Sequence, residues 1–267
     1  MRPISDYHMH TPLCGHATGE PAEYARHAVK MGLSEIGFSD HAPLVAYFDP
    51  KVSMRLDQLP LYYRMIEKAQ TEFKPQLTIK VGIEADFIPG YENKTKEILA
   101  DYPYDYVIGS VHFIDDWGFD NPEERKKWEK ENIDKVYRKY YELLRRSAQS
   151  GLFDIMAHVD LVKKFGHRST ESMAEEVKKT AKVFKECGVA VEINTSGLRK
   201  PVKEMYPEKS LLQIYQQAGV PLAFGSDAHD PLDVGKDFDK AYALAREVGY
   251  GEYVLFKKRK IERKIKI

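Results

Sequence analysis

Short apolar runs alternate along the chain with longer stretches in which apolar and charged positions recur at helical spacing. Runs rich in β-branched and aromatic residues are typical of strands that are buried on both faces. The predicted strands are Ile4–Tyr7, Glu35–Phe38, Leu77–Ile83, Tyr106–Ser110, Phe153–Met156, Val189–Ile193 and Pro221–Phe224. The amphipathic stretches between them predict helices, so the chain is interpreted as about seven consecutive βα units.

Two of the predicted helices are long enough to be placed with some detail. The first, Glu20–Met31, has Pro21 near its start and Gly32 directly after its end, which are typical positions for these residues. The second is a long charged run from Pro122 to Ser150. No linker-like stretch or internal repeat divides the 267 residues, so we expect a single domain, 1–267.

Polar residues of the types that bind metals lie immediately after the predicted strands. They are His8 and His10, Asp40 and His41, Glu84, His112, His158, Asn194, and Asp227 with His229. Repeated βα units can close into a barrel or form an open doubly wound sheet, and periodicity does not choose between them. A barrel would gather these residues on one face, whereas an open sheet would spread them along a line. The pattern therefore favours an α/β barrel that is closed or nearly closed.

Each of these positions allows a metal ligand or a structural role. His8 and His10 are two residues apart, so an extended chain points both side chains to one side, and His16 follows a glycine-containing loop. Asp40 could bind a metal, orient a histidine, donate a proton or cap a helix. Glu84 follows an apolar run, where a buried carboxylate needs a partner such as a metal.

Taken together, these candidate ligands indicate more than each residue does alone. Singly, histidines such as His112 and His158 are more often core or cap residues than ligands. Asp227 and His229 repeat the two-residue spacing of the first motif. Seven of the nine histidines nevertheless occupy such positions, while His27 and His167 do not. The set as a whole therefore indicates a metal site.

Composition narrows the metal chemistry. Cys14 and Cys187 are the only cysteines, so neither a disulfide framework nor a tetracysteine site is possible, and we expect both to be packing residues. Nitrogen and oxygen ligands favour zinc, iron or manganese. The ligands outnumber the needs of one ion, which predicts two or three divalent ions. Such centres suit phosphoester hydrolysis, although related clusters hydrolyse amides.

Charge and hydropathy limit the partners. The formal net charge is zero, so the positive field of a nucleic-acid-binding protein is missing. No apolar run approaches the roughly 18 residues of a membrane span, and the N-terminal residues lack the pattern of a signal peptide. We expect a cytoplasmic protein, monomeric or homodimeric, that acts on a small molecule and binds neither nucleic acid nor membrane.

From His8 to His229 the chain resembles the PHP superfamily, named for polymerase and histidinol phosphatase. The matching motifs are His8-Met9-His10, His16, Asp40-His41, Glu84, His112, His158 and Asp227-Ala228-His229. The resemblance implies a distorted (β/α)7 barrel with a trinuclear metal centre at the carboxyl ends of the strands. It assigns His8, His10, Glu84 and Asp227 to one ion, Glu84, His112 and His158 to a second, and His16, His41 and His229 to a third. Glu84 would bridge two ions.

Further features resemble the histidinol-phosphate phosphatases of this superfamily. They are the opening Asp6–His16, the insertion Tyr47–Arg64, and the segments Gly109–Asp120 and Asn194–Pro201. This resemblance implies hydrolysis of L-histidinol phosphate in histidine biosynthesis, with zinc together with iron or manganese as the metals. One rival hypothesis is a PHP-type phosphoesterase or phosphodiesterase that acts on nucleotides or other small phosphoesters. The other is a non-catalytic, metal-stabilised binding module.

Several residues outside the metal set are candidates for the reaction. Arg199 is expected to bind the phosphate because a guanidinium can hold two phosphate oxygens, and Arg168 and Lys163 are further candidates. Asp40 is a candidate proton donor to the leaving alkoxide, with a histidine or water as alternatives. The substrate pocket, or a packed lid, is expected to contain Tyr47, Asp115, Asp116 and Trp117. The basic C-terminus, Lys257–Lys266, could contact an acidic partner or simply be solvated.

Overall fold

The computed structural model describes residues 5–47 and 49–267, and its centre is a parallel sheet. The strands, in the order in which they pair, are β1 (Glu35–Phe38), β2 (Thr78–Asp86), β3 (Tyr106–Ser110), β6 (Ile155–Met156), β7 (Ala190–Asn194) and β8 (Leu222–Gly225). Each of these six strands overlaps a predicted one. Their spatial order follows the chain, as expected when successive βα units each add the next strand of a barrel.

An irregular segment, Asp6–His10, closes this sheet. On one side the backbone N–H of Tyr7 donates to the carbonyl of Phe224 at the end of β8 (3.1 Å). On the other side the N–H of Gly37 in β1 donates to the carbonyl of Asp6 (2.8 Å). The predicted strand at Ile4–Tyr7 is therefore a short bridging segment where the structure describes it, and Ile4 lies outside the described residues. The chain forms the distorted barrel that was predicted.

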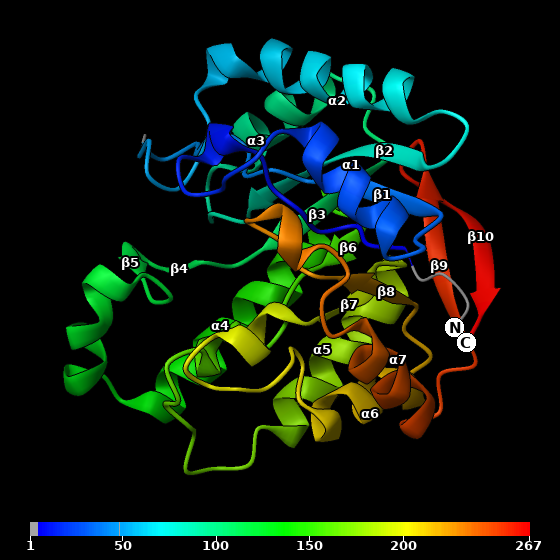
Figure 1. Cartoon of the computed structure of the whole chain (residues 1–267). Coiled ribbons are helices and arrows are strands. Elements are labelled where there is room, and N and C mark those ends of the chain that lie inside the picture. Colours follow the sequence, from blue (N-terminus) through cyan, green and yellow to red (C-terminus); the bar gives the residue numbers. More distant parts are fainter. Residues whose placement is uncertain (1–4, 48) are drawn as a thin grey trace.

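A helix follows each barrel strand and covers the outside of the barrel. They are α1 (Pro21–Lys30), α2 (Leu59–Phe73), α3 (Glu92–Ala100), α4 (Ile133–Gln149), α5 (Ala174–Cys187), α6 (Lys209–Gln217) and α7 (Phe238–Glu247). Figure 1 shows α1 to α3 on one side of the strands and α4 to α7 on the other. None of the helices in the described part of the chain combines the length and the apolarity that crossing a bilayer requires.

The long helix predicted from Pro122 to Ser150 is wrong in its first third. Residues Pro122–Lys130 form a 3₁₀ helix, and α4 begins only at Ile133. The 3₁₀ stretch is almost entirely charged and buries Trp128 alone, so it has no apolar stripe to continue the surface of α4. The side chain of Asn132 then accepts a hydrogen bond from the backbone N–H of Lys135 (3.0 Å) and starts the new helix.

Two hairpins lie outside the βα units. β4 (Phe113–Ile114) pairs with β5 (Trp117–Gly118), and β9 (Glu252–Lys257) pairs with β10 (Lys260–Lys266). The second hairpin contains the basic C-terminus, which is therefore part of the fold and not a free tail. Arg263 pairs with Glu35 at the first residue of β1 (3.3 Å). The hairpin thus covers the amino ends of the strands, at the right of Figure 1, and the carboxyl ends stay open.

Candidate metal centre

The first group of predicted ligands meets at the carboxyl ends of the closing segment, β2 and β8. His8 and His10 come from the closing segment, Glu84 from β2, and Asp227 from the turn after β8. Nε2 of His8 lies 3.1 Å from Oε2 of Glu84, and Nε2 of His10 lies 3.3 Å from Oδ1 of Asp227. Both histidines have no exposed surface, and Glu84 has 1 %. Two imidazoles and two carboxylates therefore converge in the interior of the barrel.

Glu84 also joins a second group through its other oxygen. Oε1 of Glu84 lies 3.2 Å from Nε2 of His158, which follows β6, and 3.9 Å from Nε2 of His112, which follows β3. On the side of the first group, Nδ1 of His41 lies 3.0 Å from Oε2 of Glu84. The hydroxyl of Ser110 donates to Oε1 of Glu84. This carboxylate thus stands between the two groups, where a bridging ligand is expected.

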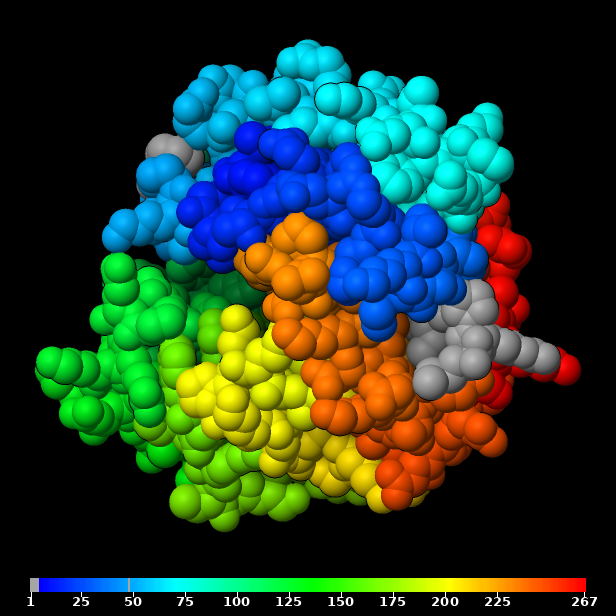
Figure 2. All heavy atoms as spheres, viewed as in Figure 1, coloured from blue at the N-terminus to red at the C-terminus, as the bar shows by residue number. Residues whose placement is uncertain are grey.

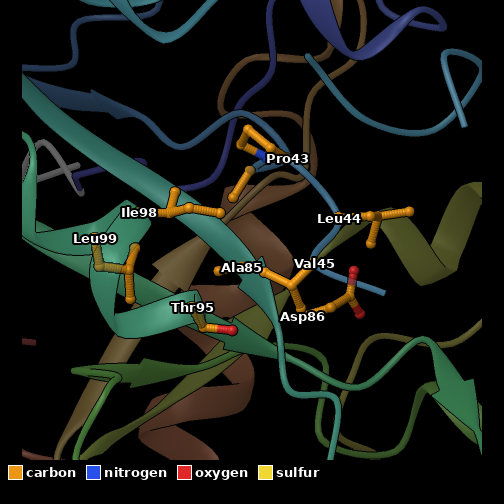
Figure 3. A pocket seen from close by; sticks show the side chains of 9 residues that line it. Pro43, Leu44, Val45, Ala85, Asp86, Thr95, Ile98 and Leu99 are labelled. Carbon is orange, nitrogen blue, oxygen red and sulfur yellow. The ribbon is translucent and has the colours of Figure 1, made fainter. Parts of the chain in front are cut away.

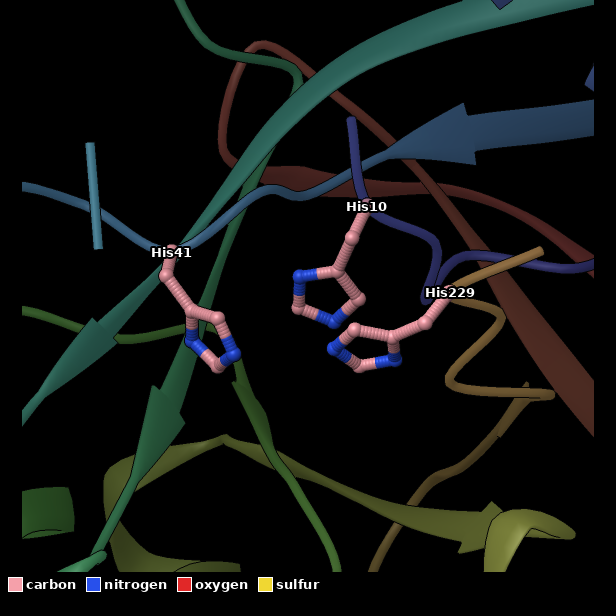
Figure 4. A group of neighbouring side chains, drawn as sticks. All are labelled: His10, His41 and His229. Carbon is pink, nitrogen blue, oxygen red and sulfur yellow. The ribbon is translucent and has the colours of Figure 1, made fainter. Parts of the chain in front are cut away.

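The third group consists of imidazoles from the loops. The rings of His10 and His229 stack with centroids 3.9 Å apart, and those of His10 and His41 lie 4.4 Å apart. Figure 4 shows these three side chains turned toward one another from three different segments. His16, which is more exposed, lies 4.6 Å from His229 between ring centroids. The structure therefore brings all nine predicted metal ligands into one cluster.

In five histidines of the cluster, Nδ1 faces a supporting oxygen of the protein, whereas Nδ1 of His41 faces the predicted ligand Glu84. The pairs are His8 with Glu192 Oε1 (2.7 Å), His10 with Asp40 Oδ1 (3.3 Å), His16 with Cys14 O (3.1 Å), His112 with Asp86 Oδ1 (2.9 Å) and His229 with Asp227 O (3.1 Å). An oxygen that accepts from Nδ1–H leaves the lone pair on Nε2, the nitrogen that can then bind a metal. Glu192 was missed in the sequence, where its signal is a carboxylate inside an apolar strand.

The unpartnered atoms of the cluster fit divalent cations. Among the described residues, Nε2 of His8, His10 and His229 and Oε2 of Glu84 are buried without a hydrogen-bond partner. Such atoms are costly to bury. Potential ligand atoms also lie within 4.8 Å of one another in several overlapping groups, among them His8, His10 and Asp227; His8, Glu84 and His158; and His10, His41 and His229. Imidazole and carboxylate ligands in this arrangement suit zinc and similar ions.

The pKa shifts in the cluster also favour a metal site. Burial would raise the pKa of Glu84, but His41 and His8 outweigh it and hold that pKa well below the usual value. Burial would lower the pKa of His8, but Glu192 and Glu84 raise it well above the usual range. In His16, burial and the neighbouring His41 lower the pKa to about 4. Glu84 is thus ionised, and without metal His8 holds a proton that a bound ion would displace.

Asp40 lies behind His10, inside the barrel wall. Its carboxylate accepts hydrogen bonds from the Thr11 hydroxyl and the His41 backbone N–H (2.8 Å) and lies 3.3 Å from His10 Nδ1. It has no exposed surface. Of the roles left open by the sequence, orienting His10 fits this geometry. The prediction of Asp40 as proton donor to the substrate is not supported, because its oxygens are already bonded and face away from solvent.

The three residues predicted to bind phosphate already have partners within the protein. Arg199 donates to the carbonyl of Ser226 (2.5 Å) and pairs with Asp233 (3.2 Å), so it fixes the turn that carries the cluster residue Asp227. Arg168 pairs with Glu204 and Glu208, and the fully buried Lys163 pairs with Asp160 and Glu204. Because their charges are already balanced by these carboxylates, neither Arg168 nor Lys163 is supported as a phosphate ligand.

Lys200 is a cation of the site that the sequence analysis missed. It follows the 3₁₀ turn Ser196–Arg199 after β7, and burial lowers its pKa while the nearby Asp227 carboxylate raises it. Its ammonium forms no hydrogen bond or ion pair with any residue that the structure describes. A second cation, Lys164, is held by Asp120 (2.9 Å). Lys200 is therefore free to bind an anion beside the cluster.

Cys14 lies closer to the cluster than a packing residue was expected to. Its buried thiol donates to the carbonyl of Thr11 (3.2 Å). Its sulfur lies within 4.8 Å of ring nitrogens of His16 and His229. The expectation that the surroundings of the metals contain only histidines and carboxylates is therefore incomplete.

Three of the four residues expected in a substrate pocket are placed elsewhere. Trp117 is buried, with its ring centroid 4.9 Å from that of Trp128, and it packs the lid from inside. Asp115 and Asp116 are exposed. Tyr47 is partly exposed and packs edge-on against Phe113 (5.6 Å between centroids). The structure thus supports a packed lid at Trp117 and leaves Tyr47 available at the surface.

The space for a substrate is the open face above the cluster. The pocket in Figure 3, behind Asp86, has a volume of about 10 Å³, room for about one water molecule. Figure 2 shows a larger hollow where the blue, green, yellow and orange segments meet. These colours correspond to the loops after the closing segment, β3, β7 and β8. The hollow therefore lies over the same strand ends that carry the cluster.

A parallel barrel that gathers buried histidines and carboxylates at the carboxyl ends of its strands defines a metal-dependent barrel hydrolase. Comparison with known proteins makes the class more specific. A family model described as "PHP domain" matches residues 6–196. The chain belongs to the PHP family.

Curated relatives and a solved structure agree with this family. The "Probable histidinol-phosphatase" of Deinococcus radiodurans is 44% identical over 98% of this chain and 100% of its own length. The "Histidinol-phosphatase" of Bacillus subtilis is 34% identical over 88% of this chain and 96% of its own. The histidinol phosphate phosphatase of Lactococcus lactis, solved with zinc, L-histidinol and phosphate, shares the fold with a TM-score of 0.79 at 24% identity, covering 97% of this chain and 99% of that one.

Proposed function

We propose that this protein hydrolyses L-histidinol phosphate to L-histidinol and phosphate with the help of divalent metals. The observation that carries the proposal is Glu84, whose two oxygens face imidazoles of different groups within 3.2 Å. A bridging carboxylate of this kind suits a multinuclear hydrolytic centre. The near-complete coverage of histidinol-phosphatase relatives supports the choice of substrate.

The nine clustered residues would hold up to three ions. His8, His10, Glu84 and Asp227 would bind one, Glu84, His112 and His158 a second, and His16, His41 and His229 a third. Zinc is the ion bound in the Lactococcus lactis structure, and iron or manganese would suit the same donors. Bound ions of this type supply a hydroxide at neutral pH and neutralise charge on the phosphoryl group.

The chain's own residues would position the phosphate. Lys200 is the cation next to Asp227 that has no partner of its own, so its ammonium would donate to a phosphate oxygen at the edge of the cluster. Arg199 would act differently from the original prediction. Its bonds to Ser226 and Asp233 keep the turn with Asp227 in place, so it would position the metal-binding carboxylate and leave direct contact with the phosphate to Lys200.

The organic part of the substrate would lie toward Tyr47 and Phe113. Burial and the nearby carboxylates of Asp86 and Glu124 together raise the pKa of Tyr47 to about 12. An aromatic pair with negative charges around it suits a group that carries an ammonium and an imidazole. This rim would favour L-histidinol phosphate over nucleotides, because both carry a phosphate but the nucleoside part has no ammonium group.

The test is phosphate release from L-histidinol phosphate by protein of known metal content. A nucleotide monophosphate and a bis-aryl phosphodiester serve as competing substrates. Selective turnover that a chelator removes and Zn²⁺ or Mn²⁺ restores is expected. The variant Asp227→Asn should be inactive, whereas Asp239→Asn, an exposed acid on α7, should retain full activity. Turnover of only the other esters would overturn the substrate, and no turnover of any ester by metal-loaded protein would overturn the enzymatic assignment.

A further inference from the structure

A buried carboxylate on β7, Glu192, is not among the metal ligands but contacts their supports on two sides. It has 1 % of its surface exposed. Oε1 lies 2.7 Å from Nδ1 of His8. Oε2 accepts hydrogen bonds from the backbone N–H of His158 (3.1 Å) and from the side-chain amide of Asn194 (2.9 Å). One side chain thus holds residues that come from the closing segment, the end of β6, and β7 itself.

The neighbouring strand makes room for this carboxylate. Gly225 of β8 pairs with Asn194 of β7 in the sheet register. A Cβ atom at position 225 would lie 1.9 Å from Oε1 of Glu192 and 2.6 Å from Cβ of His8. Any side chain there would push the carboxylate or the imidazole out of place. Glycine at this position is therefore required by the close approach of Glu192 and His8, since its φ does not lie in the left-handed region.

The network continues to the opposite side of the centre. The amide of Asn194 that donates to Glu192 also lies 3.4 Å from Oδ2 of Asp227. The hydroxyl of Ser196 donates to the same oxygen of Asp227 (3.0 Å), which leaves Oδ1 facing His10. Glu192 and Asn194 thus link the supports of His8, His158 and Asp227 within one strand.

We propose that Glu192 is the positioning residue of the metal centre, which fixes the tautomer and ring orientation of His8 and couples this ligand to His158 and Asp227. A carboxylate that accepts from Nδ1–H directs the Nε2 lone pair of His8 into the cluster and makes the imidazole a better donor. Loss of such a support typically weakens metal binding about 10- to 100-fold. The inference rests on the metal centre of the proposed function but does not depend on the substrate.

The test compares metal binding by the unmodified protein with that of Glu192→Gln and Gly225→Ala, using Zn²⁺ and Co²⁺ in competition with a chromogenic chelator. Gln keeps the size of the side chain but has only one acceptor oxygen. It therefore cannot accept hydrogen bonds from both Nδ1–H of His8 and the backbone N–H of His158. The alanine leaves Glu192 in the sequence but displaces its Oε1. Both variants should lose affinity for at least one ion by about 10- to 100-fold, with a changed visible spectrum of the Co²⁺-loaded protein.

The matched control is Glu35→Gln, which changes another buried strand glutamate that bonds to Tyr7 and Arg263, away from the cluster. It should change the melting temperature but leave stoichiometry, affinity and the Co²⁺ spectrum as in the unmodified protein. If Glu192→Gln does not fold, the Gly225→Ala result decides. Unmodified affinities in the Glu192 and Gly225 variants, or an equal loss in the Glu35 control, would overturn the positioning role alone. An unmodified protein that binds neither ion would overturn the metal centre as well.

Discussion

Glu84 shows how a side chain in this protein takes its role from residues that are distant in the sequence. A lone carboxylate with 1 % exposure would be costly to bury. Here it lies within 3.2 Å of ring nitrogens of His8 in the closing segment, His41 after β1 and His158 after β6. Its neighbours therefore explain its burial and its lowered pKa together.

Replacing Lys200 by Ala tests the residue proposed to bind phosphate. Loss of a charge-assisted hydrogen bond worth about 1.5–3 kcal/mol should lower kcat/KM for L-histidinol phosphate roughly 10- to 100-fold. The metal content should not change, because Lys200 contacts the substrate and is not a metal ligand. Steady-state kinetics and metal analysis check both points. Lys203→Ala, an exposed lysine three residues away, should behave like the unmodified protein, and a similar loss in both variants would contradict the assignment.

Asp120 predicts a pH dependence of stability for the metal-free protein. Burial would raise the pKa of Asp120, but Lys164 and His112 lower it from 3.8 to about 2. A carboxylate with a lowered folded-state pKa stabilises the fold above the unfolded value, and this stabilisation is lost as the pH falls from about 4 through about 2. Asp120→Asn should therefore lower the free energy of unfolding by about 2 kcal/mol near pH 7.

Urea unfolding of the metal-free protein at several pH values measures this difference. The gap between Asp120→Asn and the unmodified protein should stay constant from pH 8 to about pH 4 and narrow below it. A gap that does not vary with pH would show that Asp120 contributes by packing and not by charge.

At the scale of elements, the start of α4 separates the 3₁₀ stretch Pro122–Lys130 from the helix that packs on the barrel. The helix buries Tyr137, Tyr140 and Tyr141 on its inner side, whereas the preceding 3₁₀ stretch buries only Trp128. The hydroxyl of Tyr140 donates to the carbonyl of His158 (2.9 Å). The position of α4 is thus connected to the strand end that carries a metal ligand.

The cap of α4 can be tested by Asn132→Ala. Removing the side-chain acceptor for the Lys135 N–H should lower the free energy of unfolding by about 1 kcal/mol. Asn132→Asp retains an acceptor and places a negative charge at the helix N-terminus, so it should preserve stability. Thermal unfolding followed by circular dichroism compares the three proteins. Equal destabilisation by both substitutions would contradict the capping role.

For the whole molecule, the C-terminal hairpin and the metal cluster lie at opposite ends of the barrel. Arg259 of the hairpin turn pairs with Asp154, which precedes β6 (2.6 Å), and donates to the carbonyl of Leu152 (2.6 Å). The backbone N–H of Phe256 donates to the hydroxyl of Tyr7 (3.1 Å). The hairpin therefore stabilises the amino ends of the barrel strands, whose carboxyl ends carry the predicted metal ligands.

The variant Arg259→Ala tests whether the two ends of the barrel act independently. It leaves Asp154 without its cation and should lower the free energy of unfolding by roughly 2 kcal/mol, since the pair is partly buried. Metal affinity and kcat/KM should stay within about twofold of the unmodified protein, because the contact is at the far end of the barrel. Lys260→Ala, an exposed position on β10, should change neither property. A loss of bound metal in Arg259→Ala would show that the two ends are coupled.

The sequence alone determined the alternation of strands and helices and the nine residues that meet in the cluster. It did so because the apolar runs have the period of buried strands, and because parallel strands leave their carboxyl-end residues on one face. Local composition could not show that the charged run after Pro122 forms a 3₁₀ helix before α4 begins, or that Lys260–Lys266 pairs with Glu252–Lys257 in a hairpin. Both depend on what lies opposite them in space.

Only the tertiary structure decided the roles around the metals. Asp40, Glu192 and Lys200 are all polar residues near predicted strands, and nothing in their spacing separates a positioning carboxylate from a ligand or a substrate-binding cation. Their roles follow from distances across the barrel, such as the 2.7 Å between Glu192 and His8, which lie 184 positions apart in the chain. Hydrogen bonds and charges act over a few ångströms in space, so the sequence can propose such residues but the fold assigns them.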